Sequence, residues 1–214
     1  MLLEKIYSIR KRSDYVLTWQ RKLIHLLIII MFGVFMGFLA KYFDGTEIGL
    51  IGSKFGVWIF SATIIATLSR SSQSAALHVF AFFVASLSVY YFYSSLLFGF
   101  FPTKYVLMWA MLALTTPVGG WIVWFARGKG WVSSICAALP IALILVEGVG
   151  LYYSFLSGAR YIYLDIVDWF DILLAVALLL LLPRTFYQLQ KILIVTLCLF
   201  LVLEYIGIYQ YLSV

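Results

Sequence analysis

The chain has 214 residues, of which 64% are hydrophobic and only 11% are charged. Soluble globular domains are nearer half apolar and a quarter charged, so this composition indicates a lipid-facing protein without room for a separate soluble domain. The net charge of +6 does not indicate a nucleic-acid partner, because the basic residues lie at the ends of apolar segments, where they set membrane topology.

Residues 1–22 form a basic and partly amphipathic segment ahead of the first apolar run. We expect it to be a cytoplasmic helix that lies on the membrane surface, and a docking helix for a protein partner is the alternative. The apolar run that follows ends Phe38-Leu39-Ala40, which lacks the small-residue pattern of a signal-peptide cleavage site. We therefore expect an uncleaved first span and a single transmembrane helical domain over residues 23–214.

Seven apolar segments follow, and the fold class we expect is an all-α bundle of seven membrane helices. They cover residues 23–40, 49–68, 75–98, 105–126, 131–155, 165–182 and 192–209. The segment 49–68 is the weakest, because it contains Lys54, and without it the bundle would have six spans. The spacing Gly33-x-x-x-Gly37 in the first segment permits close helix contact, and the serines before the third segment are suited to cap it.

The distribution of Lys and Arg predicts the orientation of the bundle. With seven spans, 11 of the 15 basic residues fall on the side of the N-terminus and 4 on the other side. The positive-inside rule then places the N-terminus in the cytoplasm and the C-terminus outside. Short loops and the absence of asparagine, and hence of glycosylation signals, favour a bacterial plasma membrane.

The segment 131–155 is the one around which the rest of the chain is organised, because it carries Glu147 inside an apolar run. An ionisable residue within a membrane segment is a functional-site hypothesis by default. Pro140, Cys136 and Ser133 lie within about 40° of Glu147 around a helix, so this polar and small stripe should face the bundle interior. The alternative is structural, with Glu147 bonded to Lys54, to a tyrosine hydroxyl or to a backbone group.

Two helix breaks, at Pro117 and Pro140, fall about nine residues from the expected cytoplasmic ends of their segments, roughly 14 Å deep. Backbone groups that prolines and glycines free must be satisfied by protein, water or ligand, and many transporters build their sites in this way. We expect a small-molecule site between segments 105–126 and 131–155, although the threonines could simply satisfy the kink. Its candidates from the earlier segment are Thr115, Thr116, Gly119 and Gly120.

Further charged residues extend this hypothesis. Glu204 lies in the outer half of its segment, like Glu147, and the two carboxylates with Lys54 would line an outward-opening pocket. Lys54 could instead extend to the lipid headgroups. Asp165, Asp168 and Asp171 share one side of a helical turn and are weak candidates for a divalent cation, whereas acids in a first turn more often serve the helix dipole. Whether the protein uses a cofactor stays unknown from the sequence.

Binding or transport of a small molecule, with Glu147 as the polar anchor, is therefore the leading hypothesis. The size and composition are similar to those of small substrate-binding subunits of vitamin uptake transporters, without a shared motif. A non-catalytic membrane partner, such as an accessory, assembly or immunity subunit, is the second hypothesis. A membrane-embedded lipid-modifying enzyme is the third, because the sequence contains no recognisable nucleophile or metal constellation.

Overall fold

The computed structural model describes residues 9–11, 18–149 and 166–206, and in this part of the chain it contains helices joined by turns and no strand. Five helices are long and apolar enough to cross a membrane by length and composition: α2, α5, α6 with η1, α7 and α10. The helices are α2 (Trp19–Tyr42), α3 (Glu47–Ser53), α4 (Phe55–Leu68), α5 (Ser72–Phe98), α6 (Thr103–Trp124), η1 (Phe125–Arg127), α7 (Gly130–Val149), α9 (Ile166–Leu181) and α10 (Phe186–Ile206).

The described residues divide into two compact units. The α5 unit comprises residues 18–53 and 62–124, and it contains α2, α3, α5 and α6. The α7 unit comprises residues 9–11, 54–61, 125–149 and 166–206, and it contains α7, α9 and α10. Helix α4 begins in the α7 unit and ends in the α5 unit.

Most of the expected helices are observed, with ends that differ by about one turn or less. Helices α2, α5, α6 and α9 correspond to the expected segments 23–40, 75–98, 105–126 and 165–182. Helix α7 confirms the segment that begins at residue 131, and residues 150–155 lie outside the described part. The basic N-terminal segment is described only at residues 9–11 and from 18 onward, where α2 begins.

The prediction of one continuous helix over residues 49–68 is wrong. The structure has two helices there, α3 and α4, with a break at Lys54. Helix α4 has 14 residues, which at about 1.5 Å per residue is too short to cross a bilayer core of about 30 Å by itself. The break is explained by carboxylates that contact the start of α4, as described below.

The expected start of the last helix, at residue 192, is also wrong, because α10 begins at Phe186. Gln188, Gln190 and Lys191 interrupt the apolar pattern before the expected start. Thr185 Oγ1 accepts a hydrogen bond from the backbone N–H of Gln188 at 3.2 Å, and this contact caps the helix. The Gln188 side chain donates to Ser133 Oγ at 3.1 Å, so the polar groups of this turn are satisfied against α7.

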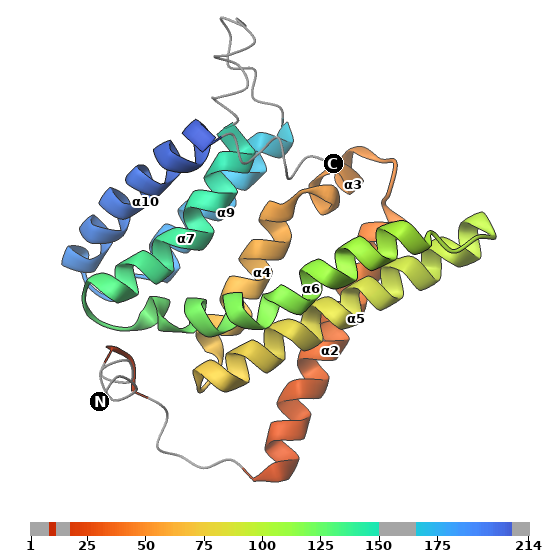
Figure 1. Cartoon of the computed structure of the whole chain (residues 1–214), viewed down its shortest axis with the longest axis horizontal. Helices are drawn as coiled ribbons and strands as arrows, with labels where there is room; N and C mark the ends of the chain where they lie inside the picture. Colours follow the sequence, from red (N-terminus) through yellow and green to blue (C-terminus); the bar gives the residue numbers. More distant parts are fainter. Residues whose placement is uncertain (1–8, 12–17, 150–165, 207–214) are drawn as a thin grey trace, which may run out of the picture. The chain divides into compact units, whose positions relative to one another are not determined.

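Helix contact in the α5 unit depends on glycines. Helix α2 packs on α5, and a Cβ atom at Gly37 would overlap the backbone oxygen of Ser86. A Cβ atom at Gly33 would lie 2.6 Å from the backbone oxygen of Phe82, so the predicted close contact at Gly33-x-x-x-Gly37 is confirmed. Helices α5 and α6 form an antiparallel hairpin (Figure 1).

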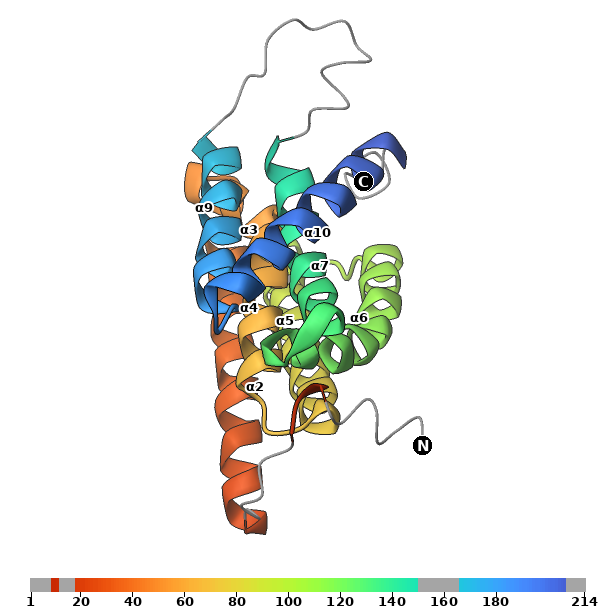
Figure 2. The same cartoon turned by 90° about the vertical axis from the view of Figure 1, so that its left-hand side faces the viewer.

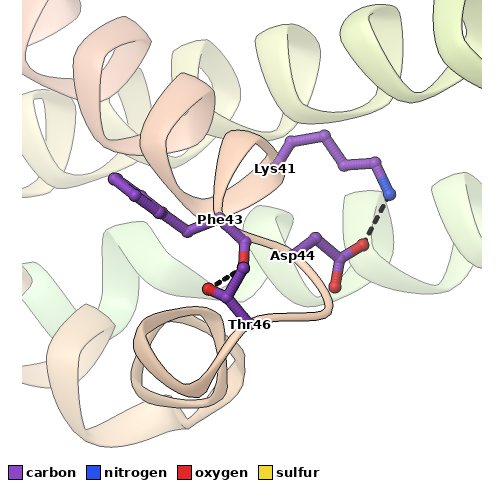
Figure 3. A network of polar contacts seen from close by, with 4 residues as sticks. All are labelled: Lys41, Phe43, Asp44 and Thr46. Atoms are coloured by element: carbon purple, nitrogen blue, oxygen red, sulfur yellow. Dashed lines mark hydrogen bonds and ion pairs between the residues drawn. The ribbon is translucent and has the colours of Figure 1, made fainter.

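Turns in the α5 unit are held by side chains. The predicted serine cap of α5 is confirmed, because Ser71 and Ser74 form a reciprocal capping box. Between α2 and α3, Thr46 Oγ1 donates to the Phe43 carbonyl at 2.6 Å, and Lys41 Nζ pairs with Asp44 Oδ2 at 2.6 Å (Figure 3). These contacts hold the turn between α2 and α3.

Helix α7 is the core of its unit. It packs on both α9 and α10 (Figures 1 and 2). Its most apolar stretch is 67% buried, against 11% to 28% in the other four long helices. A helix covered by protein to this extent can carry polar side chains without exposing them to lipid. The central position of α7 therefore allows a buried polar site on this helix.

We expect Gly37→Ala to lower the free energy of unfolding by about 1–3 kcal/mol, because α2 and α5 must separate to admit a methyl group. Thermal unfolding in detergent would measure the change. Gly119→Ala in α6 is the matched control, because nothing lies within 4 Å of a Cβ atom there. Equal losses in the two variants would show that the contact at Gly37 does not hold the helices together.

Candidate functional site

The polar stripe of α7 faces the interior of the α7 unit, as the sequence predicts. Ser133, Cys136, Pro140 and Glu147 are all buried. Glu147 lies 17 residues beyond Gly130, the first residue of α7, which corresponds to about 26 Å along the helix. The carboxylate is therefore close to the end of the helix that the sequence places on the outer side.

Glu147 meets the start of α4. Its Oε1 accepts a hydrogen bond from the backbone N–H of Phe55 at 2.8 Å. The first N–H groups of a helix lack intrahelical partners and carry a partial positive charge, so a carboxylate stabilises a helix that begins there. This contact explains the break at Lys54, and it realises the structural alternative in which Glu147 bonds a backbone group. Within the described part, Glu147 Oε2 is buried without a hydrogen-bond partner.

Lys54, at the break, forms an ion pair with a carboxylate of α9. The distance from Lys54 Nζ to Asp168 Oδ1 is 3.1 Å, and the side chains are 22% and 20% exposed. Pairing with a carboxylate was the alternative to extension toward the headgroups, and the structure shows the pairing. The ion pair joins residues that are 114 positions apart in the sequence.

Asp171 lies one turn further along α9 and is fully buried. Two glycines make room for it: a Cβ atom at Gly56 of α4 would overlap Asp171 Oδ1, and one at Gly148 of α7 would lie 2.9 Å from Asp171 Cβ. Neither carboxylate oxygen of Asp171 has a hydrogen-bond partner among the described residues. Asp171 is close enough to Glu147, Lys54 and Asp168 for their charges to act on it.

We refer to Lys54, Glu147, Asp168 and Asp171 as the carboxylate cluster. Within the described residues it combines three carboxylates with one ammonium group, so full ionisation would leave an excess of negative charge. Buried charges are costly unless they are paired and hydrogen-bonded. The cluster therefore has chemical capacity for a proton or for a positively charged group.

The opposite end of α7 is basic. The N–H of Lys129 donates to the Ile9 carbonyl at 2.8 Å, which holds the described N-terminal residues against the turn before α7. Burial and the positive charges of Arg184 and Arg127 lower the pKa of Arg10 to about 10. Basic groups that the sequence assigns to one side of the membrane therefore gather at the start of α7, and carboxylates gather at its end.

The predicted residues of α6 belong to the α5 unit. Thr116 Oγ1 donates to the Ala113 carbonyl at 2.7 Å, and Thr115 Oγ1 donates to the Leu112 carbonyl at 2.7 Å. The carbonyl of Ala113 is the one that Pro117 frees, so the threonine satisfies the kink. Gly120 packs against Ala75 and Val79 of α5, and Gly119 is exposed. Ligand binding by these residues stays a prediction.

Glu204 and the three aspartates are the remaining charged candidates from the sequence. Glu204 is buried in α10, a helix that contributes no member of the carboxylate cluster. Asp165 lies outside the described residues. Among those described, no three His, Cys, Asp or Glu side chains are placed to hold one metal ion together. Asp168 and Asp171 instead face α4 and α7, through an ion pair and through close packing.

Sequence reasoning missed the Phe55 N–H and the two glycines that flank Asp171. One signal for them was available, because Gly56 follows Lys54 by two residues in an otherwise apolar run. A lysine two residues before a glycine in such a run indicates a helix interruption at which another element can approach the backbone closely. The pairing with Glu147 was not visible, since 92 positions separate it from Phe55.

Comparison with known protein families, with curated proteins and with solved structures finds no match to this chain.

We expect Glu147→Ala to lower the free energy of unfolding by about 1–3 kcal/mol, because the Phe55 N–H loses its acceptor in a buried position. Glu147→Gln keeps an acceptor oxygen at this position, so its free energy of unfolding should fall much less. Thermal unfolding of both variants in the same detergent provides the comparison. Similar losses would mean that the charge of Glu147, and not its hydrogen bond, stabilises α4.

The excess of carboxylates predicts an asymmetry in the Lys54–Asp168 ion pair. Lys54→Met should lower the free energy of unfolding by about 3 kcal/mol, since it removes the positive charge of the cluster. Asp168→Asn should lower it clearly less, because Lys54 remains beside the other two carboxylates. A double-mutant cycle measured by thermal unfolding tests this. Equal losses for the single variants would indicate an isolated ion pair.

Proposed function

We propose that this chain is a seven-pass protein of a bacterial plasma membrane that binds or transports a small molecule through the carboxylate cluster. In this proposal α3 and α4 together make the second pass, and α9 makes the sixth. The N-terminus is cytoplasmic and the C-terminus is outside, as the distribution of basic residues favours. Glu147 is the polar anchor of the site.

The observation that carries the proposal is a group of buried charges at the start of an interrupted helix. Ionisable residues inside membrane bundles are rare, and they mark substrate and ion pathways. Transporters commonly form such sites where helices are broken, because helix N-termini attract anionic groups there. In this chain the N–H of Phe55 at the start of α4 already donates to Glu147. The groups that remain available to a ligand are therefore the carboxylate oxygens without hydrogen-bond partners.

The graded exposure of the cluster supports binding from outside. Lys54 and Asp168 are partly exposed, whereas Glu147 and Asp171 are buried. A solute that arrived at the outer end of α7 would therefore meet the ion pair first and the buried carboxylates second. This order fits the outward-opening pocket with Glu147 and Lys54 that is expected from the sequence, with carboxylates of α9 in the place of Glu204.

Native mass spectrometry of the gently solubilised protein from its own host tests the proposal. We expect the wild-type chain to retain a small molecule that Glu147→Gln loses. Asp44→Asn is the control, because Asp44 is an exposed carboxylate of the α5 unit and should leave retention unchanged.

Equal retention by wild-type protein and Glu147→Gln would show that the cluster is not the binding site. A retained protein subunit without a small molecule would instead favour the non-catalytic partner.

A further inference from the structure

Asp171 is the member of the carboxylate cluster whose surroundings leave its charge unmatched. We propose that Asp171 binds an exchangeable proton in the resting protein, and that the ligand of the cluster is a cation whose arrival displaces this proton. The ligand class rests on the proposed function, whereas proton binding by Asp171 stands on the geometry alone.

The positive groups that the described residues bring to the cluster are already engaged. Lys54, from the start of α4, pairs with Asp168, and the N–H of Phe55 donates to Glu147. Among the described residues, Glu147 from α7 and Asp168 from α9 are the other charged groups that act on Asp171, and both are carboxylates. An ionised Asp171 would add a further negative charge to this buried group, and a proton on its carboxyl removes that charge.

The space around Asp171 favours a proton over a larger cation. The residue is fully buried, with Gly56 on one side and Gly148 on the other, each too close to accept a methyl group. The backbones of α4 and α7 therefore enclose the carboxyl group directly. A proton adds no volume to this arrangement, whereas a hydrated ion would have to separate the two helices from α9.

The exchange balances in charge and atoms. The carboxyl group of Asp171 loses its proton to water as the cation enters the cluster, and the positive charge of the cation beside the Lys54–Asp168 pair compensates the resulting carboxylate. One positive charge enters the cluster as one leaves, so the buried charge does not change. The amine or other cationic group of the ligand needs no oxidant or co-reactant.

Infrared spectroscopy of the full-length protein in detergent tests the proton directly. We expect the carbonyl band of a protonated carboxylic acid at neutral pH, a shift of that band in deuterium oxide, and its loss at alkaline pH. The band should disappear in Asp171→Asn and remain in Asp44→Asn, because Asp44 is an exposed aspartate of the α5 unit that pairs with Lys41. A band that remains in Asp171→Asn would overturn the proposal.

Labelling with carboxyl-¹³C aspartate provides an assignment that needs no variant. The band should shift with labelled aspartate and stay in place with labelled glutamate. The absence of an aspartic-acid band from the labelled wild-type protein would overturn the proposal even if Asp171→Asn failed to fold.

The two proposals fail in different measurements. A molecule retained in native mass spectrometry that is anionic or neutral would overturn the cationic ligand class and leave the binding function intact. If no molecule is retained but the aspartic-acid band is present, the binding function fails and the proton site on Asp171 stands.

Discussion

The hydrogen bond from the Phe55 N–H to Glu147 is the interaction on which the site depends. It places a carboxylate at the first turn of α4, where the unpaired N–H groups and the helix dipole favour negative charge. Without that acceptor, the chain between α3 and α4 would expose backbone donors in an apolar interior, which is costly. The break in turn releases Lys54 to reach Asp168, so one contact determines both the interrupted helix and the ion pair.

Helix α7 can make these polar contacts at a low desolvation cost, because protein rather than lipid surrounds it. The stripe from Ser133 to Glu147 is buried against neighbouring helices of its unit. At the first turn of α7, Ser133 accepts a hydrogen bond from the side chain of Gln188 in α10. At the last turn, the stripe contacts α4 and α9. A helix that faced lipid could carry such a polar stripe along its length only at a large desolvation cost.

Much of the fold could be predicted from the sequence, because apolar runs and turn residues are local signals. The inward stripe of α7 also follows from spacing alone, and Glu147 and Lys54 were both recognised as exceptional. The partners were not predictable, since the contacts join residues 92 and 114 positions apart. Asp168 and Asp171 share a helix face, which suggested a metal site, but spacing cannot reveal that Lys54 and two glycines meet that face.

The arrangement of the carboxylate cluster also constrains how a ligand would reach it. Asp171 is enclosed by the backbones of α4 and α7, whereas the Lys54–Asp168 pair is partly exposed. An incoming cation would be attracted by Asp168 and repelled by Lys54, so it must exchange partners with the ion pair before it reaches the buried carboxylates. Lys54 lies at the helix break, directly before the Phe55 N–H that donates to Glu147. Entry to the site would then be coupled to the same break that Glu147 creates.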